Sequence, residues 1–364
     1  MREQKSILLF FLVILITPYV LTEQIKLSLD LEINEPENII FHGLFDIATD
    51  SKNNIYLLDY KEKMIYLFSE EGRFQKKIGR PGQGPGEFER PRSIYLDSKD
   101  TVYILDEWHR RVEIFDSKAN YIKSIKFLNF PTGEPSIIVD KSGNFYISGY
   151  YRIQNAVVAK FASTGELIKY FPLPVKEYKG IKLNGFEKIE VMEYLCGGSM
   201  CFDEEEKKLF FSYKWPYSIK ILTKTGKELF QFSRKNNLNW TPLILKTDRN
   251  GFLFGPYTSS LKIFLLNNNY LVNSISCLDW EGNPKIKLPP PHVLTKNPEK
   301  YFKIKGQFAV LDIYTKEGDF IASTVMDGKI YFLCSDNKGR LLAIKVDEND
   351  IPRIVRYRIE MTNN

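Results

Sequence analysis

The chain has 364 residues, of which 43% are hydrophobic, 14% aromatic and 26% charged, and its formal net charge is +6. This is ordinary globular composition with enough apolar residues for a large core, and the 26 Phe and 21 Tyr favour β-structure. The small positive surplus is scattered, and no basic run with interleaved aromatic residues is present, so we expect no nucleic-acid partner.

Residues 1–22 form a candidate targeting segment. A short basic start with Arg2 and Lys5 precedes about 15 mostly apolar residues, which is typical of a secretory signal peptide and short for a membrane span. Val20 and Thr22 only loosely resemble a small-x-small cleavage site, so an uncleaved N-terminal anchor is the alternative. In both cases we expect an exported protein, periplasmic or secreted, that contacts a membrane only through an uncleaved segment.

The body of the chain, residues 23–364, is expected to form one domain built from a repeat. Asp59 aligns with Asp106, and Phe68 with Phe115, each 47 residues apart. Repetition at that period in a strand-rich sequence predicts four-stranded antiparallel blades that close into an all-β propeller.

Further units of alternating strands and Gly or Asn turns follow the first. They are expected at about 92–127, 135–171 and 200–232, from about 243, around 310–324, and at 328–359, with insertions at roughly 175–195 and 277–307. Candidate third-strand positions are Phe68, Phe115, Phe161, Leu222, Phe264, Tyr314 and Tyr357, which would count seven. We predict six blades with an elaborated fifth, and seven is the alternative.

The last unit stops after its third strand. A closed ring leaves no exposed sheet edge, so another segment must supply the fourth strand. Residues 25–33 alternate like a strand just after the targeting segment. We therefore predict that this N-terminal strand pairs with the C-terminal blade and closes the ring.

Two segments resemble the NHL-repeat propellers. Gly79-Arg-Pro-Gly-Gln-Gly-Pro-Gly-Glu-Phe88 resembles the linker between blades of that family, and 105–115 resembles the matching pair of strands. The family positions are occupied by Asp106, Arg111, Val112 and Phe115, whereas His109 stands where the family usually has Asn. The whole chain resembles bacterial exported six-bladed propellers of unassigned function. The resemblance implies the fold and a tendency to bind partners, since NHL propellers are protein- or RNA-binding platforms and a few are enzymes.

Asp59 and Asp106 end second strands, where a carboxylate can accept backbone N–H bonds in the following turn. Arg111 is expected to pair with such a carboxylate. We interpret these three residues as structural, and a ligand role is the alternative.

Only three histidines occur, at His42, His109 and His292. Their loops are expected on one face of the ring, where three imidazoles could hold a divalent metal ion that activates water. Simple exposure on loops is the alternative. The lyase or hydrolase that such a site would support is our second functional hypothesis.

Aromatic residues in the same loops could line a binding mouth for a peptide or glycan. They are Trp108, Tyr150, Tyr151, Trp215, Tyr217 and Tyr257, and His109, next to Trp108, is a further candidate for this mouth. Packing between blades is the alternative. Cys196 and Cys201 could close a small disulfide loop, or the four cysteines could simply be core residues.

The leading hypothesis is a monomeric, exported propeller that binds a protein, peptide or glycan at one face, with no catalysis and no cofactor. The second is a metal-assisted lyase or hydrolase whose site lies at the mouth of the central channel.

Overall fold

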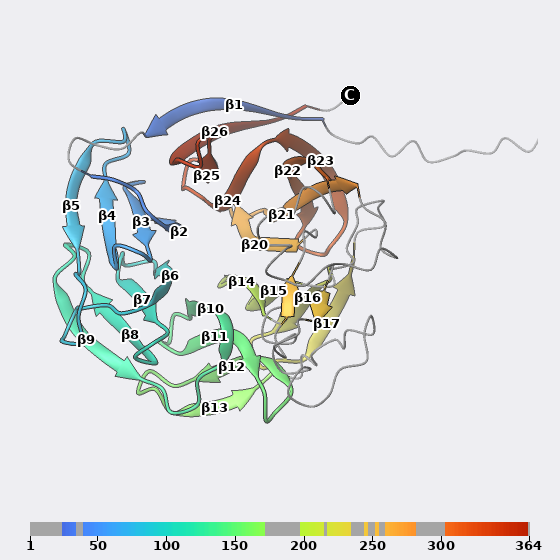
Figure 1. Ribbon diagram of the computed structural model, residues 1–364. Helices are drawn as coiled ribbons and strands as arrows, with labels where there is room; N and C mark the ends of the chain where they lie inside the picture. The colour runs from blue at the N-terminus through green and yellow to red at the C-terminus, as the bar shows by residue number, and fades with distance from the viewer. Residues whose placement is uncertain are drawn as a thin grey trace, which may run out of the picture.

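The computed structural model describes residues 24–33, 39–171, 197–214, 217–233, 244–246, 252–254, 259–281 and 303–362. The candidate targeting segment 1–22 lies outside these residues. Every regular element in the described ranges is a β-strand, and six four-stranded antiparallel sheets form a ring (Figure 1). Within the same ranges, no helix has the length and apolar character needed to cross a membrane.

Each sheet is one blade, whose strands run in order from the innermost to the outermost. Blade 1 consists of β2 (Leu44–Thr49), β3 (Ile55–Asp59), β4 (Met64–Phe68) and β5 (Phe74–Ile78). Blade 2 consists of β6 (Pro91–Leu96), β7 (Val102–Asp106), β8 (Arg111–Phe115) and β9 (Tyr121–Lys126). Blade 3 consists of β10 (Thr132–Val139), β11 (Phe145–Tyr151), β12 (Ala156–Phe161) and β13 (Leu167–Tyr170). Blade 4 consists of β14 (Gly198–Asp203), β15 (Lys208–Tyr213), β16 (Ile219–Thr223) and β17 (Glu228–Phe232). Blade 5 consists of β20 (Ser259–Leu266), β21 (Tyr270–Glu281), β22 (Lys303–Thr315) and β23 (Phe320–Asp327). Blade 6 consists of β24 (Lys329–Ser335), β25 (Leu341–Val346), β26 (Pro352–Thr362) and β1 (Gln24–Ile33).

The prediction of six blades is confirmed, and the sequence repeat is a repeat of strand register. Ile55 pairs with Phe68 in blade 1, and Val102 pairs with Phe115 at the equivalent place in blade 2. The alternative count of seven is wrong because Phe264 lies on β20, an innermost strand, and not on the third strand of an additional blade.

The fifth blade begins later than predicted. It starts at Ser259, whereas β18 (Ile244–Lys246) and β19 (Phe252–Phe254) form a separate two-stranded hairpin. The predicted elaboration lies between β21 and β22, which reach 12 and 13 residues. Residues 282–302 between them, like the predicted insertion at 175–195, lie outside the described residues.

The core is divided into six apolar clusters, and each cluster lies between two adjacent blades. Alternate residues of one strand pack against the two neighbouring blades. On β3, Ile55 and Leu57 pack against blade 6, and Tyr56 and Leu58 pack against blade 2. This explains why β3 is buried along its whole length, because sheets stacked around a ring cover both faces of every blade.

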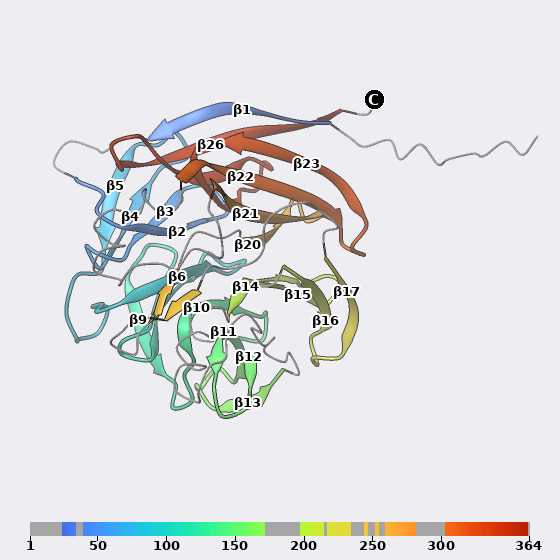
Figure 2. The ribbon, with the colours of Figure 1, turned by 45° about the vertical axis from the view of Figure 1, so that its right-hand side comes forward.

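The N-terminal strand closes the ring, as predicted. β1 pairs antiparallel with β26 from Gln24↔Thr362 to Ile33↔Ile354, so that the first and last described strands lie side by side (Figures 1 and 2). The sheet order β1-β26-β25-β24 makes β1 the outermost strand of blade 6. The two ends of the chain therefore hold one blade together.

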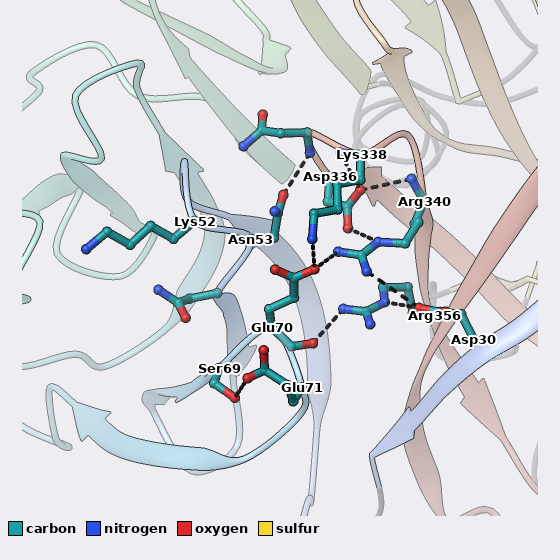
Figure 3. Close-up of polar contacts among 12 residues, drawn as sticks. Asp30, Lys52, Asn53, Ser69, Glu70, Glu71, Asp336, Lys338, Arg340 and Arg356 are labelled. Carbon is teal, nitrogen blue, oxygen red and sulfur yellow. Dashed lines mark hydrogen bonds and ion pairs between the residues drawn. The ribbon is translucent and has the colours of Figure 1, made fainter.

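A network of charged side chains supports this seam between blades 6 and 1 (Figure 3). Asp30 on β1 lies 2.7 Å from Arg356 Nε and 2.7 Å from Arg358 Nη2, both on β26. Glu70, in a turn of blade 1, accepts bonds from Lys338 and Arg340 of blade 6. Burial raises the pKa of Asp30, but Arg356 and Arg358 outweigh this effect and hold the pKa below its usual value.

Acid is expected to weaken the seam. Hydrogen bonds from Lys338 and Arg340 lower the pKa of Glu70 from 4.5 to about 2. Because the folded-state pKa is depressed, the stabilisation by Glu70 is complete above the unfolded-state pKa and is lost as the pH falls through the folded-state pKa. The free energy of unfolding in urea should be larger for wild type than for Glu70→Gln at about pH 6. This difference should vanish as the pH falls to about pH 2. A difference that stays constant with pH would contradict this role of Glu70.

Candidate functional site

The ring has two unlike faces, which follow from the strand directions. Innermost strands begin beside the loops that join second to third strands: Leu44 pairs with Asp59, and Tyr60 N donates to Gly43 O at 3.0 Å. We call this side, which also carries the linkers between blades, the mouth face. The opposite side carries the turns between first and second and between third and fourth strands, and we call it the turn face.

A cavity of about 660 Å³ opens at the centre of the ring, among the first residues of the innermost strands. All six innermost strands contribute to its wall, through Asp46, Ser93, Ser136, Ser199, Lys262 and Leu333. Its volume lies in the range of small-molecule sites, roughly 300–1,000 Å³. The central channel is thus hollow where the sequence analysis placed a binding mouth.

β-Bulges direct several side chains into this cavity. The pairing register of the innermost strand shifts at Phe45 in blade 1, Arg92 in blade 2, Leu261 in blade 5 and Leu333 in blade 6. All four residues line the cavity. A bulge adds an unpaired residue and re-aims its side chain, so the same local irregularity in four blades builds the wall.

Asp46, in the cavity wall, connects blade 1 with blades 2 and 5. Its Oδ1 accepts bonds from Ile47 N at 3.1 Å and Lys262 Nζ at 2.7 Å, and its Oδ2 accepts from Ile94 N at 3.2 Å and Ser93 Oγ at 3.3 Å. Only 3% of Asp46 is exposed. Both carboxylate oxygens are therefore already occupied by donors of blades 1, 2 and 5.

Serines at the equivalent level join other blades. Ser93 Oγ accepts a bond from Ile137 N at 3.3 Å, and Ser199 Oγ accepts one from Ile263 N at 3.0 Å. Ser136 Oγ lies 2.7 Å from Ser148 Oγ of its own blade and donates to Gly198 O of blade 4 at 3.5 Å. These hydroxyls hold neighbouring blades in register and are engaged within the protein.

Three cationic side chains face the cavity from blades 2, 4 and 5: Arg92, Lys214 and Lys262. Lys214 Nζ lies 2.8 Å from Glu134 Oε2. Desolvation raises the pKa of Glu134, but the positive charges of Lys214, Arg92 and Arg90 outweigh it and lower this pKa below its usual value. Glu134 is therefore a carboxylate at neutral pH, held among cations.

Arg92 is held in position by its surroundings. Its Nε lies 3.0 Å from Glu107 Oε2. Its guanidinium carbon lies 5.0 Å from the ring centre of Phe45 and 5.4 Å from that of Tyr60. Cation–π contacts with two rings orient the guanidinium at the cavity wall.

The two predicted turn aspartates close turns. Asp59 Oδ1 accepts bonds from Lys61 N and Glu62 N, at 3.0 and 3.1 Å, and its Oδ2 accepts from the chain entering β2. Asp106 accepts from Glu89 N and Arg90 N at 3.0 and 2.9 Å. Each carboxylate fastens the start of the innermost strand to the end of the second strand.

The expected pairing of Arg111 with one of these aspartates is wrong, because Arg111 forms its ion pair with Glu113. It also donates to three carbonyls of the glycine-rich linker, at Gln83, Gly84 and Glu87, over 2.9–3.0 Å. Burial raises the pKa of Glu113, and Arg111 opposes that shift. The linker is thus held in place by a buried guanidinium.

The two described histidines lie on loops of the mouth face. His42 is exposed and its Nδ1 contacts Glu62 Oε1, whereas His109 Nδ1 lies 2.7 Å from Asp106 Oδ2 and its ring is largely buried. Neither lines the cavity, and His292 lies outside the described residues. In the described part of the chain, no three or more His, Cys, Asp or Glu side chains form a group able to hold a metal ion.

The predicted aromatic mouth divides into exposed and buried residues. Trp108 is 66% exposed on the β7–β8 loop of the mouth face, whereas Tyr150, Tyr151 and Tyr217 are buried in three different clusters between blades. These three tyrosines contribute to blade packing, the alternative that the sequence left open. Trp215 and Tyr257 lie outside the described residues, as does Cys196, while Cys201 is a free thiol.

Among the described residues, nine exposed large apolar side chains lie on outermost strands, and five lie on loops of the mouth face. In addition to Trp108, the residues on these loops are Ile40, Leu128, Ile153 and Ile351, which are 59, 93, 90 and 41% exposed. The described turns of the turn face carry no exposed large apolar residue; their sequences, such as Asp50–Asn54 and Asp336–Arg340, are polar. Sequence analysis missed these aliphatic residues, although each is a lone large apolar side chain in a loop between strands.

Comparison with known proteins agrees with this architecture. The sequence matches the model of the family DUF5128, described as a six-bladed β-propeller, over residues 42–229. A search of curated proteins finds no match.

Several solved structures are similar. One is a DUF4221 family member from Bacteroides vulgatus, with a TM-score of 0.61 and 13% identity, covering 94% of this chain and 100% of that one. Another, from Bacteroides fragilis, is described as exported and has a TM-score of 0.55 and 12% identity, covering 92% and 95%. A virginiamycin B lyase from Staphylococcus aureus reaches a TM-score of 0.49 at 12% identity over 92% and 99%, too distant to bear on function. At these identities the likeness shows the fold alone.

Proposed function

Since the chain belongs to the six-bladed β-propeller family DUF5128, we propose that it is an exported binding platform whose mouth face docks a polypeptide. The observation that carries this proposal is the apolar rim, which we define as Ile40, Trp108, Leu128, Ile153 and Ile351 on the loops of that face. The central cavity lies on the same side of the ring.

The rim favours docking because exposed apolar side chains gain free energy only when a partner covers them. Trp108, at 66% exposure, has the size and rigidity of an interface anchor. Charged pairs such as Lys63–Glu89 and Arg90–Glu107 lie on the same face. Apolar anchors among polar neighbours are typical of surfaces that bind proteins.

Binding without catalysis fits the engagement of the polar groups. Asp46 is saturated with donors, and Glu134 is paired with Lys214. The two described histidines contact carboxylates on loops away from the cavity wall. These groups are arranged as a recognition surface.

Export is part of the proposal. It is supported by the basic and apolar character of residues 1–22 and by the similarity to a protein described as exported. The platform would then act outside the cytoplasm, in the periplasm or at the cell surface.

Loss of the rim is expected to abolish docking. We would select phage-displayed peptides and screen a glycan array against the immobilised protein, and then compare wild type with Trp108→Ser/Ile153→Ser. Removing two such anchors should weaken peptide binding by about 30-fold or more, by analogy with interface hot spots. The matched control is Lys52→Ser/Lys118→Ser, which changes two exposed side chains of the turn face and should bind like wild type.

Two results would overturn the proposal. One is that the selected peptides bind the rim variant as tightly as wild type. The other is that glycans are the only ligands retained, which would make the platform a sugar-binding one.

A further inference from the structure

Resting on the proposed function, we infer that the central cavity captures the free C-terminal carboxylate of a polypeptide whose last residue is apolar. The rim would hold the body of the partner, while the end of its chain enters the ring. Three features of the cavity support this role: its charge balance, its apolar wall and its engaged hydroxyls.

Cations outnumber carboxylates among the side chains that line the cavity, and Glu107, the partner of Arg92, does not line it. Arg92, Lys214 and Lys262 face it, against the carboxylates of Asp46 and Glu134. Asp46 is buried and already accepts four donors, so it presents no free acceptor. An anionic group on the ligand complements this surplus of cations.

Arg92 and Lys214 form the carboxylate-binding end. Lys214 Nζ lies 2.8 Å from Glu134 Oε2, and Arg92 lines the same cavity. The Glu134 side chain is 55% exposed, whereas that of Lys214 is 16% exposed and that of Arg92 is 12% exposed. Glu134 is therefore the most exposed member of the cluster, and its carboxylate occupies, beside Lys214, the place that a ligand carboxylate would take.

An apolar wall faces the cavity from the blades on the other side of the ring. Apart from Pro135, its large apolar side chains come from blades 1, 5 and 6: Leu44, Phe45, Leu261, Leu333 and Ile344. The charged cluster comes from blades 2, 3 and 4. A residue with a carboxylate at one end and an aliphatic or aromatic side chain at the other matches both walls at once.

A sugar matches this cavity less well. Oligosaccharides present hydroxyl groups in all directions and need free donors and acceptors around them. The serine hydroxyls at the cavity level are engaged within the protein, as the contacts of Ser93, Ser136 and Ser199 show. Gln307 Nε2 likewise donates to Ser276 Oγ and Tyr331 Oη, and the wall further presents cations and apolar side chains, which favours the chain end of a polypeptide.

The test uses N-acetylated tetrapeptides Gly-Gly-Ser-X, with X each of the twenty residues, each made as the free acid and as the C-terminal amide. Binding to the full-length protein is measured by isothermal titration calorimetry. Free acids with X as Leu, Ile or Phe should bind most tightly, and amidation should weaken them about 10-fold or more, as expected for loss of a charge-assisted hydrogen bond.

Variants locate the site. Lys214→Met should weaken the acids about 10-fold or more and leave the amides unchanged, whereas Glu134→Gln should strengthen the acids because it removes the internal competitor. The control Lys63→Met removes a lysine of the same face that pairs with Glu89 away from the cavity, and it should bind like wild type.

Equal binding of acids and amides, equal binding by Lys214→Met, or no binding of any peptide up to millimolar concentration would each overturn the inference. If uronic-acid oligosaccharides bind in the cavity instead, the inference also fails. The rim experiment fails separately, because it detects polypeptide docking that needs no free chain end. The two proposals can therefore be distinguished.

Discussion

A chain that begins at residue 34, and so lacks β1, is expected to lose cooperative unfolding. β1 supplies the fourth strand of blade 6, and its removal exposes the edge of β26 along its pairing from Ile354 to Thr362. It also removes Ile33 from one cluster and Ile25 and Leu27 from the next. Fully burying such a side chain contributes about 1.5–3 kcal/mol; Ile33 is buried and Ile25 and Leu27 are partly buried, so the loss is a large part of the free energy of unfolding of a typical domain, about 5–15 kcal/mol.

Thermal unfolding followed by circular dichroism would measure this effect. A chain that begins at residue 23 is the control and should unfold in one sharp transition. Adding a synthetic peptide of residues 24–33 to the shortened chain should restore the transition, because an added strand can complete an open sheet edge. A shortened chain that unfolds like the control would show that other contacts close the ring and that β1 contributes little to its stability.

Replacing Arg111 by alanine is expected to lower the free energy of unfolding by about 3–5 kcal/mol, since it leaves a buried carboxylate without its counterion. Arg111 is 6% exposed and Glu113 is fully buried. The variant also releases the three linker carbonyls that the guanidinium holds. Urea unfolding of the purified variant would measure the loss.

Two further variants test the geometry of this contact. Arg80→Ala is the matched control, because Arg80 pairs with Glu87 in the same linker but is 77% exposed, and its loss should cost less than about 1 kcal/mol. Arg111→Lys keeps the charge but lacks the planar fork that reaches several carbonyls, so it should recover only part of the stability. An Arg111→Ala variant as stable as the Arg80→Ala control would contradict this account.

Most of the fold could be predicted from the sequence because register repeats with it. The same spacing places Phe68 and Phe115 opposite Ile55 and Val102, so a period in the sequence becomes a period in the sheets. Ring closure followed from counting strands. The alternative count of seven arose because Phe264 resembles a third-strand position, whereas the sheet order shows that its strand is innermost.

The cavity could be predicted only in part. Its location on the mouth face follows from loop order, but its wall is built by bulges, such as those at Arg92 and Leu261, and a bulge leaves no clear pattern in the residues themselves. Tyr150 and Tyr217 look like loop aromatics, but neighbouring blades cover both of them. Burial between blades depends on residues far away in the chain, and no local pattern reports it.

The pairing of β1 with β26 also fixes the order of events during synthesis. β1 precedes every other described strand, and its partner β26 follows all of them, so β1 is made long before the strand with which it pairs. Contacts between such distant segments form slowly, and unpaired strand edges meanwhile promote aggregation. Blade 6 cannot be completed before β26 has been made, so the ring stays open until that strand appears, and a chain in that state can be captured by a chaperone.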